Sequence, residues 1–180
     1  MTNGTVDLRS KPVADIEGYR TLLNRSYQPF FQVDLPANWL LEEHRLETKQ
    51  GEWISIVGPV NTSKSRNSAL DIYIFKESDR TRSISDIVEQ SIADEGIGDY
   101  QINTRQAASV SDQQGQEVQL TFTTYYRTES GLAEVTIVKK WVTLMHGDYV
   151  VQIFYEAPIE DFDRYLNAYE IAKQTFTFIE

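Results

Sequence analysis

The stretch "FFQVDLPANWL", residues 30–40, indicates how the folded domain begins. Its apolar residues alternate with polar ones up to Leu35, and this period of two predicts a half-buried strand. Pro36 supplies no backbone donor and favours extended geometry at Leu35, so we expect the strand to end there. Trp39 can then fold back over the edge of the sheet as a large apolar plug.

Further strands follow along the chain. Residues 52–59, "EWISIVGP", alternate as a strand does and end at a Gly-Pro pair. Residues 69–75, "ALDIYIF", carry apolar side chains in both alternating sets, which predicts a strand covered on both faces. The second half of the chain has the pattern of an antiparallel meander. Turn-forming residues separate its four extended segments, near residues 100–111, 116–127, 132–146 and 149–157.

Three segments show helical periodicity. Apolar residues recur at helical spacing over residues 13–23. Residues 83–96 have the pattern of an amphipathic helix, in which Ser83 and Asp86 suit a capping box. The last helix covers residues 158–176, with a Pro near its first position and acidic residues in its first turns.

These elements predict the α+β class. With helices available for both faces of a mainly antiparallel central sheet, we expect a three-layer α/β/α sandwich. The chain of 180 residues has the length of one domain. We therefore expect residues 1–12 to be a polar lead-in or tether and residues 13–180 to form a single domain.

Composition excludes several classes of function. The chain has 17 basic and 27 acidic residues, a formal net charge of −10, so it repels nucleic acid and we expect no nucleic-acid partner. It has no cysteine, hence no disulfide and no thiolate site. No apolar stretch approaches the roughly 18 residues that span a bilayer, so we expect no direct membrane span. The sequence as it stands favours a cytoplasmic protein, or an extracytoplasmic one if an N-terminal signal or anchor was removed.

The order of elements resembles the PsbP-like fold family, which includes extrinsic photosystem II subunits, Mog-type Ran-binding adaptors and bacterial lipoproteins. The resemblance covers residues 27–180 and begins at "FQVDLPANW", which is similar to the family's opening F-x-hydrophobic-x-x-P-x-x-W. It continues through "ALDIYIF" and "SISDIVEQSI" to "GDYVVQIFYEAP" and "FDRYLNAYEIAKQTFTFI". The resemblance implies a non-catalytic protein that docks on an assembly, binds a protein partner or binds metal ions.

Residues with metal-ligating chemistry are few. His146 and Asp148 flank a glycine in "MHGDY", where a tight turn is expected. We interpret His146 first as a turn residue, with a divalent metal or small-ligand site at His146 and Asp148 as the alternative. No cofactor is expected otherwise, because the sequence has no HExxH, no complete GxGxxG and no GxSxG.

Catalysis has weak support. Glu156, Glu160 and Asp161 could supply a pair of carboxylates for a hydrolase, but two of them suit a helix start and the chain is rich in acids. We therefore assign no catalytic residue. Aromatic residues crowd the meander, and Tyr125, Trp141 and Tyr149 are candidates for an interaction surface. The preferred hypothesis is a non-enzymatic accessory or partner-binding domain with a protein partner.

Overall fold

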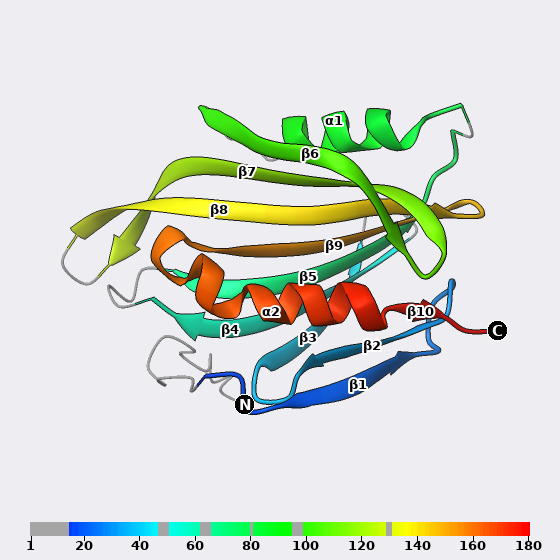
Figure 1. Cartoon of the computed structure of the whole chain (residues 1–180), viewed down its shortest axis with the longest axis horizontal. Coiled ribbons are helices and arrows are strands. Elements are labelled where there is room, and N and C mark those ends of the chain that lie inside the picture. The colour runs from blue at the N-terminus through cyan, green and yellow to red at the C-terminus, as the bar shows by residue number, and fades with distance from the viewer. Residues whose placement is uncertain (1–14, 47–50, 62–65, 80, 95–98, 129–130) are drawn as a thin grey trace, which may run out of the picture.

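The computed structural model describes residues 15–46, 51–61, 66–79, 81–94, 99–128 and 131–180. Ten strands and two helices lie within these residues (Figure 1). The strands are β1 (Tyr19–Asn24), β2 (Phe31–Pro36), β3 (Leu40–Leu46), β4 (Gly51–Val60), β5 (Asn67–Lys76), β6 (Tyr100–Val110), β7 (Gln113–Thr128), β8 (Gly131–His146), β9 (Tyr149–Pro158) and β10 (Thr177–Phe178). The helices are α1 (Ile84–Asp94) and α2 (Ile159–Thr175).

The strands form two sheets. A seven-stranded sheet has the order β3-β4-β5-β9-β8-β7-β6, and a three-stranded sheet has the order β1-β2-β10. All neighbouring strands pair antiparallel. In the large sheet the meander β6-β7-β8-β9 joins the β3-β4-β5 half through the pairing of β9 with β5.

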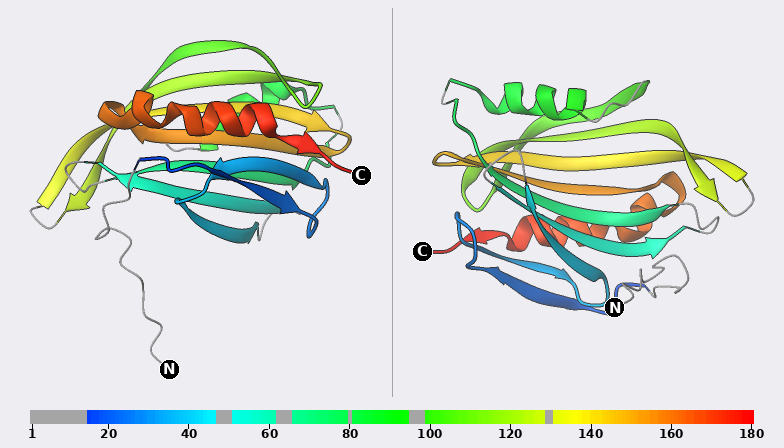
Figure 2. Two further views of the ribbon diagram at one scale, coloured as in Figure 1. Left: turned by 60° about the horizontal axis from the view of Figure 1, so that its bottom comes forward. Right: turned by 180° about the vertical axis from the view of Figure 1, so that it is seen from behind.

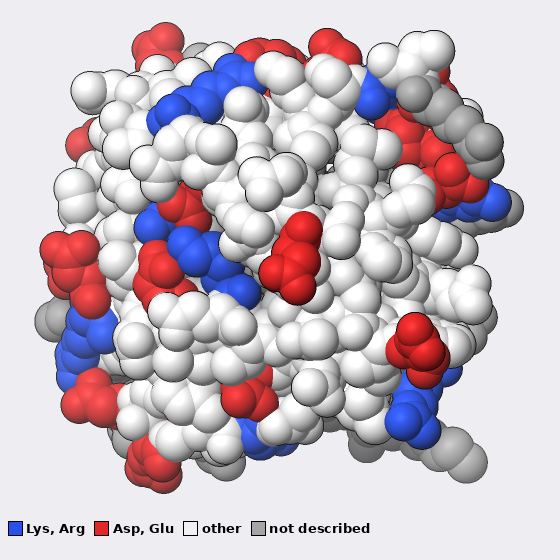
Figure 3. Space-filling view, turned by 45° about the vertical axis from the view of Figure 1, so that its right-hand side comes forward, with Lys and Arg blue, Asp and Glu red and all other residues white. Residues whose placement is uncertain are grey.

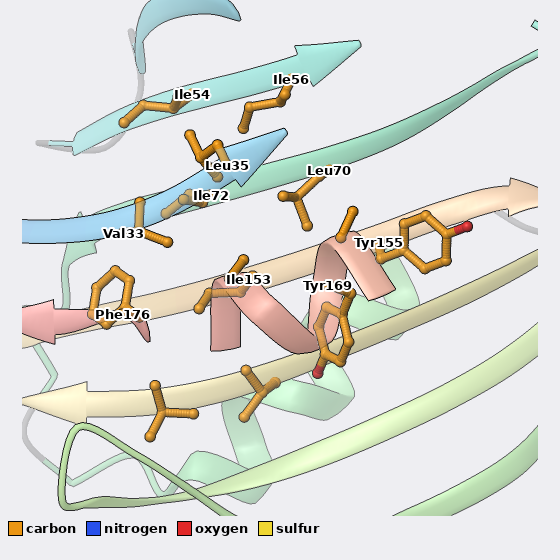
Figure 4. Close-up of a cluster of buried hydrophobic side chains, with 14 of the residues drawn as sticks. Val33, Leu35, Ile54, Ile56, Leu70, Ile72, Ile153, Tyr155, Tyr169 and Phe176 are labelled. Carbon is orange, nitrogen blue, oxygen red and sulfur yellow. The ribbon is translucent and has the colours of Figure 1, made fainter. Parts of the chain in front are cut away.

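The main core lies between the large sheet and the elements on one of its faces. Both α2 and the small sheet cover that face, as Figure 2 shows. Alternate residues of β4, β5 and β9 point into this core, where they meet β2 and α2 (Figure 4). Helix α1 packs against the opposite face, where Val88 and Ile92 contact Val118, Leu120 and Trp141. Apolar side chains are buried on both faces of the central strands. The large sheet therefore packs between α1 on one face and α2 with the small sheet on the other.

The corner that follows β2 closes the core. Trp39 is 2% exposed, and its indole meets the Tyr165 ring edge-on, with ring centroids 5.9 Å apart. The same indole lies against Gly58 of β4, where a Cβ atom would come within 2.7 Å of the ring. The prediction that Trp39 folds back as an apolar plug is confirmed, and the close approach of its indole requires a glycine at position 58.

The structure confirms the α+β class and the mainly antiparallel sheet, including the four-stranded meander. It also confirms the capping box, in which Ser83 Oγ accepts from the Asp86 amide and Asp86 accepts from the Ser83 amide. The helix predicted over residues 13–23 is wrong, because residues 19–24 form β1 and pair with β2. The three-layer description stays a prediction, since a second sheet shares the α2 side. The lead-in predicted for residues 1–12 lies outside the described residues.

Candidate interaction surfaces

Strands β7 and β8 extend beyond their neighbours in the large sheet. β6 pairs with β7 only as far as Tyr100 opposite Phe122, and β9 pairs with β8 only as far as Pro158 opposite Ile137. Residues 123–128 of β7 and 131–136 of β8 pair with each other and, within the described ranges, with no third strand. We call these two segments the hairpin arm. It projects past the end of the sheet in Figures 1 and 2.

The two sides of the hairpin arm differ. On one side Val135 is buried and the Arg66 guanidinium lies over the Tyr126 ring, 5.2 Å from its centroid, so this side is anchored to the body. On the other side Tyr125 is 63% exposed and Leu132 is 74% exposed. Strand alternation places Tyr125 and Leu132 on the same side, because Tyr125 pairs with Glu134, two residues from Leu132.

The hydroxyl of Tyr125 is held in place although the ring is exposed. It donates a hydrogen bond of 2.8 Å to Glu134 Oε2, and this bond raises the pKa of Tyr125 above its ordinary value. The bond fixes the ring over the hairpin and leaves its apolar body in water. Because the Tyr125 ring is already held in place, it has little conformational freedom to lose when a partner binds.

A pocket lies at the opposite end of β8, where the two sheets meet. It has a volume of about 410 Å³, and its walls are the residues just before β2, the end of β5, the turn between β8 and β9, and the residues that follow β10. Its lining includes His146, Asp148 and Tyr149, together with Lys76 and Phe30. The structure therefore places His146 and Asp148, the predicted metal or ligand pair, in one pocket with Tyr149, a predicted interaction-surface residue.

The environment of His146 is aromatic. Its ring stacks on Phe178 of β10, with centroids 3.9 Å apart and an interplanar angle of 16°. In the described part of the chain, no three His, Asp or Glu side chains gather closely enough to hold a metal ion. The metal site at His146 and Asp148 stays a prediction, because the pair gains no third ligand from the residues around it.

Trp141 is not a surface residue. It is 1% exposed and stacks on Phe154, with ring centroids 5.5 Å apart, in the cluster under α1. Its place in the predicted interaction surface is therefore wrong. Trp141 lies on the face of β8 that α1 covers.

The three candidate carboxylates do not converge. Tyr155 points into the core beneath α2, so its neighbour Glu156 points to the opposite face, where Arg66 and Lys139 bind it. Glu160 and Asp161 belong instead to the first turn of α2. Burial and the neighbouring Glu160 raise the pKa of Asp161 above its ordinary value. A hydrolase based on these carboxylates stays a prediction.

A buried ionic network was not foreseen. The Glu117 carboxylate is 2% exposed, and it accepts hydrogen bonds of 2.7 Å from Lys173 and from the hydroxyl of Tyr169. Lys140 lies 3.5 Å from Glu117 and 2.9 Å from Glu170. Burial opposes ionisation of Glu117, but the hydrogen bonds from Lys173 and Tyr169 and the charge of Lys140 hold its pKa below the ordinary value. The network links α2 to β7 and β8. The sequence around Glu117 did not predict it, because a single glutamate in a strand has no distinctive pattern.

Charge is dispersed over the surface. In Figure 3, basic side chains occur in small groups beside acidic ones, between broad areas that carry no charged residue. A phosphate backbone needs a continuous basic stripe, and this face offers none among the residues drawn in colour. No helix in the described ranges is long and apolar enough to cross a membrane.

Comparisons with known proteins bear on the fold. No protein-family model and no curated protein sequence matches the chain. Among solved structures, cyanobacterial PsbP (CyanoP) from Synechocystis sp. PCC 6803 has a TM-score of 0.55 and 11% identity, over 96% of this chain and 99% of that one. LpqN, involved in cell envelope biogenesis of Mycobacterium tuberculosis, has a TM-score of 0.54 and 14% identity, over 94% and 100%. PA94 from Pseudomonas aeruginosa, a protein of unknown function named as a candidate regulator, has a TM-score of 0.54 and 13% identity, over 89% and 99%.

The chain therefore has a PsbP-like fold, and the resemblance that began at "FQVDLPANW" is confirmed at the level of the fold.

Proposed function

We propose that this chain is a non-enzymatic accessory domain that binds a protein partner through the exposed side of its hairpin arm. The observation that carries the proposal is the pair formed by Tyr125 and Leu132, 63% and 74% exposed on one side of a two-stranded projection. An accessory role agrees with the proteins that share the fold, among them cyanobacterial PsbP and LpqN, which is involved in cell envelope biogenesis.

The physical chemistry of the arm suits protein contact. Burying a leucine side chain fully is worth about 1.5–3 kcal/mol, and tyrosine is enriched at interfaces because its ring is apolar while its hydroxyl stays hydrogen-bonded. A two-stranded hairpin is marginally stable alone in water, so a partner that covers its open side stabilises it further. Both effects favour the complex over the free arm.

Charge indicates the kind of partner. A protein with a formal net charge of −10 attracts basic surfaces and repels acidic ones. We therefore expect a basic protein partner, with association that slows as salt is added. At the contact itself, Glu134 beside Tyr125 and Arg127 opposite Leu132 supply one charge of each sign, so the preference for a basic partner comes from the net charge of the chain.

The fold neighbours also bear on location. LpqN is involved in cell envelope biogenesis, which favours an extracytoplasmic place for this chain over a cytoplasmic one. Fractionation of the native host with an antibody against the chain tests this point, and recovery with the cytoplasmic enzymes contradicts it.

Affinity capture from the native host tests the arm. The bait pair is the natural chain and the double variant Tyr125→Ser, Leu132→Ser. Leu23→Ser is the matched control, because Leu23 is also an exposed leucine, at 48%, but lies on β1 of the small sheet. We expect a set of proteins that the natural chain and the control retain and the double variant loses. Equal capture by all three baits contradicts the proposal.

A further inference from the structure

Strand β6 is an edge of the large sheet, and its outer side is open. It pairs with β7 on one side, and the described residues supply no neighbour on the other. Nearly every residue from Tyr100 to Ser109 is exposed, including Ile102 at 42%. A register shift between Ile102 and Thr104 interrupts the strand, and a regular stretch of pairs follows from residue 104 to residue 110. That stretch is long enough to receive an added strand of ordinary length.

The two edges of the sheet differ in the residues that discourage strand addition. The opposite edge, β3, carries the run "EEHR" at residues 42–45, and charged side chains of this kind protect an edge. β6, with the sequence "YQINTRQAASV", carries one charged residue, Arg105. Its guanidinium is turned back onto α1 and β7, where it binds Glu89, Ser85 and Gln116. β6 also has no proline, so apart from the register shift between Ile102 and Thr104 nothing in its sequence blocks strand addition over residues 104–110.

The surroundings of β6 show what this edge can accept. Small side chains occupy its regular stretch at Ala107, Ala108 and Ser109, which leaves room for larger side chains on an added strand. Helix α1, which contacts the strand through Arg105, has no basic residue and three acidic ones: Asp86, Glu89 and Asp94. Glu89 binds Arg105 of β6, and Asp86 lies one turn before Glu89 on the same side of the helix. An added strand therefore runs beside these two acidic side chains on the α1 side of the sheet.

We propose that the outer edge of β6, over residues 104–110, binds an extended, basic segment of a partner protein by strand addition. Backbone hydrogen bonds hold the segment, and its Lys or Arg side chains lie toward the acidic residues of α1. The inference rests on the proposed partner-binding function but concerns a surface separate from the hairpin arm.

Charge favours a basic segment over a second copy of the chain. Two copies that join through β6 bring together two acidic helices and two molecules with a net charge of −10. A basic segment removes that repulsion and adds attraction. Dimerisation is thus the competing outcome that the experiment must detect.

The probe is a fluorescein-labelled peptide of eight residues in which Lys alternates with Val or Thr. Its fluorescence anisotropy is measured against the full chain, and amide hydrogen exchange of the chain is followed by NMR with and without peptide. Comparison peptides have Glu in place of Lys, or proline at two central positions. We expect the Lys peptide to bind and the other two peptides not to bind. We also expect the Lys peptide to slow hydrogen exchange at alternate amides between residues 104 and 110.

A pair of variants tests the backbone contact. Amides of neighbouring strand residues point in opposite directions, so one of Ala107→Pro and Ala108→Pro removes an outward donor and the other breaks the pairing with β7. The variant that keeps the melting temperature is the informative one. We expect it to weaken peptide binding about tenfold or more, as the loss of one to two backbone hydrogen bonds implies. Glu89→Gln should weaken binding, because Glu89 is the acid of α1 that reaches β6 through Arg105, and Asp163→Asn, an exposed acid on α2, should not.

Three results overturn the inference: no binding of the Lys peptide, equal binding of the Glu peptide, or protection at amides outside β6. A dimer in sedimentation velocity that the informative proline variant abolishes also overturns it, because the edge is then filled by a second copy. The proposed function is tested separately, because its test depends on Tyr125 and Leu132. If the Lys peptide does not bind at β6 but capture of a partner still depends on the hairpin arm, only the strand-addition proposal is refuted.

Discussion

The substitution Glu117→Gln should destabilise the protein through the buried ionic network. Each oxygen of the Glu117 carboxylate faces a lysine ammonium: Oε2 accepts from Lys173 and Tyr169, and Oε1 lies near Lys140 and accepts from Gln106. A glutamine amide has one oxygen and one NH2 group. Whichever way it turns, its NH2 group meets an ammonium group that needs an acceptor.

The size of the effect follows from what remains after the substitution. Removing one partner from a buried pair costs about 3–5 kcal/mol when the other charge is left alone. Here Lys140 and Lys173 both keep Glu170, at 2.9 and 3.0 Å. We therefore expect a loss near the lower limit, about 3 kcal/mol of unfolding free energy.

The effect should depend on pH in one direction. The pKa of Glu117 in the folded protein lies below its ordinary value, so its ionised form stabilises the fold above about pH 4.3. This stability is lost as the pH falls through the folded-state pKa, because the natural residue then becomes neutral as well. The difference between the natural chain and Glu117→Gln should be full at pH 7 and smaller below pH 4.

Urea unfolding followed by circular dichroism measures the effect, with the slope of the transition as a check on two-state behaviour. Glu134→Gln is the matched control, because Glu134 is exposed and binds one hydroxyl. A loss for Glu117→Gln below about 1 kcal/mol, or a loss at pH 7 that does not shrink as the pH is lowered below 4, refutes the reasoning.

Three further substitutions test the packing. Gly58→Ala should cost about 1–3 kcal/mol, because the new Cβ atom would lie 2.7 Å from the buried Trp39 indole; an unchanged urea midpoint contradicts this. Ser83→Ala should cost about 1 kcal/mol in the same assay, since it removes the side-chain half of the capping box with Asp86, and a loss within error shows that the cap contributes nothing. Trp141→Ala should cost about 3–5 kcal/mol, as expected for an indole 1% exposed, and a small loss in thermal melts contradicts its core position.

Elements with strict local periodicity were predictable from the sequence. The meander followed from alternation and turn residues, and α1 followed from its capping box and apolar stripe. β1 was missed because its apolar residues also fit helical spacing, and only pairing with β2 distinguishes the two. β3 was missed because "EEHR" has the charge of a loop, although His44 packs on Trp53 across the strand pair. Partners distant in sequence decided both cases.

The candidate surfaces were predictable in part. Both Tyr125 and Trp141 were predicted from their aromatic character, and only Tyr125 is exposed. Alternation fixes the face of a residue and does not show whether a helix covers that face. Leu132 gave no signal, since a single leucine after a turn has no pattern. The arm had a partial one: the extended segment at 132–146 is longer than its neighbour at 149–157, so part of it must pair elsewhere. The Glu117 network depends on lysines from β8 and α2, which no local pattern connects.

Site-specific photo-cross-linking tests the partner-binding account most directly. A benzophenone amino acid at position 125 samples the open side of the hairpin arm, and the same group at position 23 samples an exposed position on β1. In the native host, we predict one discrete cross-linked product from position 125, absent from position 23 and lost when Leu132→Ser is added. No product from position 125, or the same products from both positions, contradicts the claim that the arm binds a protein partner.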